Sequence, residues 1–214
     1  MTAPVGVAML AVAHWPSADP ASVPPIAGFV TSAFSPLAAA VADMCLSEAF
    51  GAPPAPPELG EGIAIVLASV TGDLATSAAI ADAVSHGQRV PPLLFFQSNP
   101  NAVAGHIAAR WGLAGPVVCS IPAADPMADA IGSAALLIED GDATAALVVV
   151  ASTYGDGRVA ATAALIGPGK WVGDRAEEPA LAADQPAQRA SHPFTFGVRD
   201  AVQTPWQAPV ARGG

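Results

Sequence analysis

The sequence is poor in charge. Only 12% of its 214 residues are charged, whereas about a quarter are charged in a typical soluble domain. Apolar residues make up 52%, but the longest apolar runs, such as 62–70 and 143–152, have about nine or ten residues. A membrane-spanning helix needs roughly 20. We therefore expect the apolar excess to lie in a large interface with an obligate partner.

Basic residues and cysteines are also few. The eight Lys and Arg residues are scattered singly among 18 Asp and Glu residues, and the net charge is −10. Without a basic cluster to neutralise phosphates, nucleic-acid binding is not expected. Cys45 and Cys119 lie in apolar surroundings without the spacing of a metal site. We interpret them as buried reduced thiols and expect neither a metal ion nor a cofactor.

The first residues, 1–12, lack both the basic segment and the cleavage pattern of a signal peptide. This absence, together with the reduced thiols, predicts a cytoplasmic protein without a membrane anchor.

Strands and helices alternate along the chain. Hydrophobic patterning predicts five strands, at 5–15, 63–70, 117–121, 145–152 and 159–166. The segment 63–70 is apolar on both faces, which is typical of a parallel sheet covered by helices on both sides. Tyr154-Gly155-Asp156-Gly157 indicates a hairpin between the last two strands.

Helices are predicted between these strands, at 35–50, 73–85, 101–111 and 126–138. Ser35-Pro36 and Asp125-Pro126 are typical cap-plus-proline starts. The stripe of the second helix has Leu74, Ala78, Ala81 and Val84 near one face. The segment 91–100 is interpreted as an extended apolar loop. The pattern predicts an α/β domain over 1–170, followed by an irregular C-terminal tail over 171–214.

One segment carries a specific motif. Residues 101–116, NAVAGHIAARWGLAGP, resemble β-ketoacyl synthases of fatty-acid and polyketide assembly, whose corresponding segment reads approximately N-x-x-A-G-H/R-I/L-x-x-x-x-G-L-x-G-P. The similarity continues without gaps through Gly132–Ser152 and covers about residues 60–170. The resemblance implies the amino-terminal half of a thiolase-like fold, a βαβαβ-type, five-stranded mixed sheet covered by helices.

The nucleophile of that family is missing. Members carry a cysteine eight residues after the Gly-Pro, at the start of the central helix, where the helix amino terminus stabilises a thiolate. Here Ala124 occupies that position, and a methyl group cannot attack a thioester. Cys119 lies five residues upstream, inside the predicted strand, and Ser120 follows it. Using either residue would break the gapless match of the following helix, so no catalytic residue is expected.

The family's catalytic histidines lie in the second half of its fold, and this chain ends near where that half would begin. None of the four histidines here falls in a comparable motif. His106 matches a helix position of the family and is interpreted as structural. Since both nucleophile and histidines are missing, we do not expect the chain to catalyse condensation alone.

The resemblance also implies a partner. Ketosynthases dimerise through the strand that corresponds to Val117, Val118, Cys119, Ser120 and Ile121. In type II polyketide systems an inactive homologue, the chain-length factor, pairs with an active ketosynthase and shapes its acyl tunnel. Small subunits of polyene and aryl-polyene pathways are similar in kind. The expected partner is a full-length ketosynthase, which would bind acyl carrier protein.

The segment expected to line the partner's tunnel comprises Leu94, Phe95, Phe96 and Gln97, unless the phenylalanines fill the domain's own core. Two other functions stay open at this point. The chain could be an active truncated acyltransferase using Cys119 or Ser120, or a homodimeric acyl-binding scaffold.

Overall fold

The computed structural model describes residues 7–15, 23–123, 125–154 and 159–168. The elements in chain order are β1 (Val7–Trp15), α1 (Phe34–Phe50), α2 (Pro57–Gly60), β2 (Ile63–Ala68), α3 (Leu74–Ser85), α4 (Pro92–Ser98), α5 (Pro100–Trp111), β3 (Val117–Ser120), α6 (Pro126–Glu139), β4 (Ala145–Thr153) and β5 (Val159–Pro168). All five predicted strands and all four predicted helices are present. None of the described helices is both long and apolar enough to cross a bilayer.

The strands form one mixed sheet in the order β1-β5-β4-β2-β3. β2 runs parallel to β4 and β3, while β5 is antiparallel to β4 and β1. β2 is buried along its whole length, as expected for a parallel strand with apolar residues on both faces. The predicted five-stranded mixed sheet is therefore confirmed.

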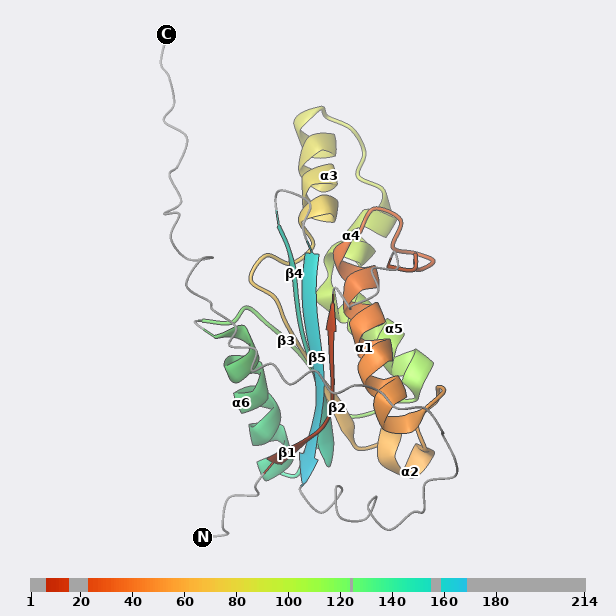
Figure 1. Ribbon diagram of the computed structural model, residues 1–214. Helices are drawn as coiled ribbons and strands as arrows, with labels where there is room; N and C mark the ends of the chain where they lie inside the picture. Colours follow the sequence, from red (N-terminus) through yellow and green to blue (C-terminus); the bar gives the residue numbers. More distant parts are fainter. Residues whose placement is uncertain (1–6, 16–22, 124, 155–158, 169–214) are drawn as a thin grey trace, which may run out of the picture. The chain divides into compact units, whose positions relative to one another are not determined.

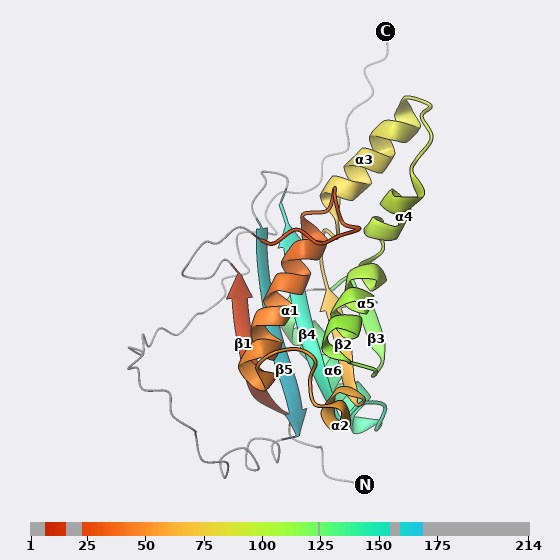
Figure 2. The ribbon, with the colours of Figure 1, turned by 90° about the vertical axis from the view of Figure 1, so that its right-hand side faces the viewer.

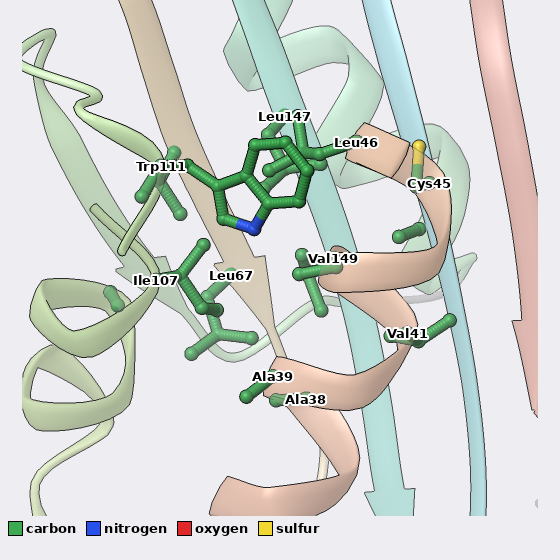
Figure 3. Close-up of a cluster of buried hydrophobic side chains, with 14 of the residues drawn as sticks. Ala38, Ala39, Val41, Cys45, Leu46, Leu67, Ile107, Trp111, Leu147 and Val149 are labelled. Carbon is green, nitrogen blue, oxygen red and sulfur yellow. The ribbon is translucent and has the colours of Figure 1, made fainter. Parts of the chain in front are cut away.

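Helices cover both faces of the sheet, as Figure 1 shows with α1 and α5 on one side and α6 on the other. On the first side, Trp111 packs among Leu46, Leu147 and Ile107 (Figure 3). Its indole nitrogen donates to Asp43 Oδ1 at 2.6 Å, and Asp43 also pairs with Arg110. The hydrogen bond satisfies the only polar atom of the ring, so the whole side chain can be buried.

Two local predictions were wrong. The segment 91–100 is not an extended loop, because Pro92–Ser98 form helix α4. Its prolines do not interrupt a helix, since Pro92 and Pro100 each stand at the start of one, where no backbone N–H is needed. Ser35 is not the cap of α1, which begins at Phe34; its N–H donates to Ser32 Oγ at 2.8 Å. The short helix α2 was not predicted.

The segment that joins α5 to β3 passes very close to β2. A Cβ atom added at Gly115 would lie 2.5 Å from the Ile63 carbonyl oxygen. We expect Gly115→Ala to lower the free energy of unfolding by about 1–3 kcal/mol, because the backbone must shift to accept the methyl group. Gly132→Ala, on α6 with open space around it, should instead raise it by about 0.5–1 kcal/mol. Urea denaturation of the full chain measures both changes, and equal midpoints for the two variants would contradict this expectation.

Candidate functional site

The predicted interface strand, β3, lies at the edge of the sheet and pairs only with β2 in the described residues. The carbonyl groups of Pro116 and Ser120 accept hydrogen bonds from Ile65 and Ser69 of the β2 side. Backbone polar groups alternate in direction along a strand, so those of Val117 and Cys119 face the open edge. Ile121 follows the strand and is 81% exposed. An open edge with apolar neighbours is a surface on which a further strand can pair.

Helix α6 begins directly after the expected nucleophile position. Ala124 itself lies outside the described residues. Asp125 Oδ1 accepts the N–H groups of Met127 and Ala128, each at 3.1 Å, and Asp129 Oδ2 accepts the Ala123 N–H at 2.7 Å. The N–H groups that could stabilise an anion at this helix start are thus bound to carboxylates of the chain itself. These carboxylates also disfavour any added negative charge.

A cavity of about 450 Å³ lies beside β3, at the carboxyl ends of β2 and β3. Its apolar lining includes Phe34, Leu67 and Val117, and its polar lining includes Asn99 and Asn101. Among the described residues that line it, Cys119 has the only titratable side chain. A thiol here therefore has no neighbouring general base in the lining.

Neither cysteine has the environment of a reactive thiolate. Burial raises the pKa of the Cys45 thiol to about 12, despite a lowering contribution from the backbone of Leu165. Burial also raises the pKa of the half-buried Cys119. The pKa of a reactive cysteine is lowered by a nearby cation or a helix amino terminus. The pKa values of both thiols are raised instead.

The predicted tunnel segment is α4, and its side chains divide into two groups. Phe95 and Phe96 are 60% and 52% exposed, so they do not fill the core of their own domain. Gln97 is 1% exposed and its Oε1 accepts the Thr31 N–H at 3.0 Å. Leu94 is partly buried. The helix therefore presents aromatic rings outward and is anchored inward by Gln97.

The loop before α1 supports α4. The Phe29 ring lies 5.6 Å from that of Phe96 and 6.3 Å from His106. Sequence reasoning did not assign a role to Phe29 or Thr31, because both lie more than 60 positions before α4 and no local pattern marks the contact. The predicted structural role of His106 fits its place beside Phe29. His192 lies outside the described residues.

The described histidines do not gather near β3. His14 is in hydrogen-bond contact with Thr162 at 3.1 Å, and His86 with Asp82 on α3. In the part of the chain that the structure describes, no group of three or more His, Cys, Asp or Glu residues could hold a metal ion.

The strand order and the helix that follows the edge strand define an α/β protein with the amino-terminal half of a thiolase-like fold. The model for the β-ketoacyl synthase N-terminal domain matches residues 32–158. The chain belongs to the β-ketoacyl synthase family. A search of curated protein sequences gave no significant match.

The solved structures that are similar to this chain include the following three. A chain of the ketosynthase ApeO in complex with its chain length factor ApeC from Xenorhabdus doucetiae is 20% identical, with a TM-score of 0.55, over 70% of this chain and 63% of that one. The ishigamide ketosynthase/chain length factor is 20% identical, with a TM-score of 0.59, over 72% and 49%. A β-ketoacyl synthase from Burkholderia phymatum is 18% identical, with a TM-score of 0.60, over 76% and 49%. The matches thus span about half to two thirds of those chains.

Proposed function

We propose that this chain is a non-catalytic subunit that pairs with an active β-ketoacyl synthase and shapes its acyl tunnel, as a chain-length factor does. The observation that carries the proposal is the start of α6. Alanine precedes it in place of a nucleophile, and Asp125 occupies the N–H groups that could stabilise a thiolate or an oxyanion. A site arranged in this way does not form a thioester.

Pairing would take place through β3. The open edge beside Val117 and Cys119 offers backbone donors and acceptors to a strand of the partner. Two of the structurally similar chains come from assemblies described as a ketosynthase with a chain length factor, which supports a pairing of this kind. α4 would then face the partner with Phe95 and Phe96, at the far end of the acyl tunnel.

The partner would supply the catalytic groups and the surface that binds the carrier protein. It would contribute the cysteine, the histidines and a basic surface for the acidic acyl carrier protein, which a chain of net charge −10 is poorly suited to bind. The product class that we propose is a polyene or aryl-polyene type chain, made in the cytoplasm. The segment 171–214 is proposed to be a C-terminal tail separate from the domain.

Reconstitution tests this function. A full-length ketosynthase from the same gene neighbourhood is assayed for extension of acyl and malonyl units with and without this chain, and the mixture is treated with an acyl-thioester probe and with iodoacetamide. We expect condensation only when both proteins are present, and label only on the partner. The Cys45 thiol should stay unlabelled by iodoacetamide, because burial raises its pKa to about 12 and keeps it protonated.

The alternatives give different results. Acyl label on Cys119 or Ser120 would indicate an active truncated acyltransferase. Native mass spectrometry of the co-purified protein tests the second alternative. A homodimer without ketosynthase would indicate an acyl-binding scaffold. Condensation by this chain alone would overturn the proposal.

A further inference from the structure

Helix α3 has an apolar face that the described structure leaves uncovered. Of its 12 residues only Thr76 and Ala83 are buried, and Val84 is 63% exposed. The predicted stripe of Leu74, Ala78, Ala81 and Val84 therefore does not face the core. A helix of this length is marginally stable in water without tertiary contacts. Its exposed face thus needs a surface to cover it.

α3 also lies away from the sheet. Figures 1 and 2 both show it beyond the ends of the strands, with α4 beside its base. Among the described elements, α4 is the one against which α3 packs most. We call residues 74–98, which comprise α3, α4 and their connection, the arm. Because the arm contributes little to the core, its apolar face is not explained by the stability of this domain.

The base of the arm is firmly held. The Thr71 hydroxyl donates to the Thr153 carbonyl oxygen, and the Thr153 hydroxyl donates to that of Gly72, both at 3.1 Å. Buried Asp73 caps α3, where its carboxylate accepts both the N–H and the hydroxyl of Thr76. The arm, which follows β2 along the chain, is therefore held in one direction at the end of β4. A fixed direction lowers the entropy that a binding partner must overcome.

The β3 edge lies beside the base of the arm, because both line one cavity. The exposed Val70 lies between them, since it lines the same cavity as Val117 and Ile121 and directly precedes the base of the arm. The arm has two charged residues, Asp82 and Arg89, and one histidine, His86. A surface of this composition fits an apolar partner surface rather than a charged one.

We propose that the exposed face of α3 is a second docking surface for the catalytic ketosynthase, separate from the β3 edge and from the tunnel contact of α4. This inference rests on the proposed function. The occupant is a different chain, because two copies of this one would bring together net charges of −10 each. The partner contributes an apolar surface that approaches closely over Ala78 and Ala81. The face then contributes to partner affinity and not to product length.

Charged variants of α3 test the proposal. Val84→Arg and Ala81→Arg would force a guanidinium into the apolar contact, so affinity for the co-expressed ketosynthase should fall at least about tenfold, equivalent to about 1.4 kcal/mol. Leu136→Arg is the matched control. Leu136 is 60% exposed on α6, which covers the face of the sheet opposite α1 and α5. It should bind as the parent does. Product length made by the remaining complex should be unchanged in all three.

Hydrogen exchange provides a second measurement that needs no variant. Amides of 74–85 should exchange at least about tenfold more slowly in the complex than in the free full-length chain, because binding buries the helix. Equal exchange in both states, or unchanged affinity of both α3 variants in a complex that forms normally, would overturn the α3 surface alone. If the variants weaken self-association of this chain instead, the occupant is a second copy and the inference is wrong. If no ketosynthase binds the parent chain, the proposed function fails with it.

Discussion

Cys119→Pro is expected to weaken the binding of this chain to its proposed ketosynthase partner and to lower condensation accordingly. The Cys119 N–H faces the open edge of β3, whereas the β2 side is bonded through Pro116 and Ser120. Proline removes the outward donor and places its ring at the edge, but leaves the hydrogen bonds to β2 intact. An unsatisfied buried partner group costs about 1–3 kcal/mol, so affinity should fall roughly 10- to 100-fold. Size-exclusion chromatography and surface plasmon resonance measure the loss of affinity for the ketosynthase.

Cys119→Ala is the control for this variant. It removes the same thiol but keeps the backbone N–H, so it should bind the partner and support condensation like the parent. Circular dichroism should confirm that both variants are folded. Condensation lost in Cys119→Ala would point to the thiol itself as a reacting group. Normal binding of a folded Cys119→Pro variant would show that β3 is not the interface.

Phe95→Ala is expected to lengthen the products of the complex without abolishing activity. The ring is largely exposed on α4, and no ring contact within the described residues holds it. If it closes the far end of the partner's tunnel, its removal frees a depth of roughly three carbon–carbon bond lengths, which admits about one or two more two-carbon units. Mass spectrometry of the released acyl chains measures the change.

Three further variants give this prediction its contrast. Phe96→Ala should have a smaller effect on length and some cost in stability, because its ring also packs on Phe29. Leu94→Ala is also expected to lengthen the products. Gln97→Leu should act differently, by loosening the anchor to Thr31, and is expected to broaden the product distribution. Unchanged length for Leu94, Phe95 and Phe96 variants alike would exclude a gating role.

Hydrophobic patterning was a good guide wherever it reported on burial. The apolar run at 63–70 predicted a covered parallel sheet, and β2 and the neighbouring β4 are buried almost throughout. Asp125 and Pro126 start α6 as predicted, since capping and proline geometry act within a few residues of chain. Such signals are local, so a single sequence contains them completely.

The same patterning was misleading in the arm. Seven residues of α4 span about two helical turns, which are too few to distinguish a helix from an extended chain by hydrophobic period, so 91–100 was predicted to be an extended loop. The stripe on α3 was read correctly as a helix, but sequence alone could not reveal that it faces outward. The hydrophobic period of a helix identifies its apolar face, but it does not identify the element that packs against that face.

By itself, the sequence determined the alternation of strands and helices, the family motif at 101–116 and the alanine at position 124, where the family resemblance predicts a nucleophile, because each depends on residue identity and spacing along the chain. Only the tertiary structure decided that Asp125 accepts the first N–H groups of α6, that β3 is the edge strand of the sheet among the described residues, and that Gln97 is buried while Phe95 is exposed. These properties depend on which atoms meet across the fold, and contacts such as that between Thr31 and Gln97 join residues 66 positions apart.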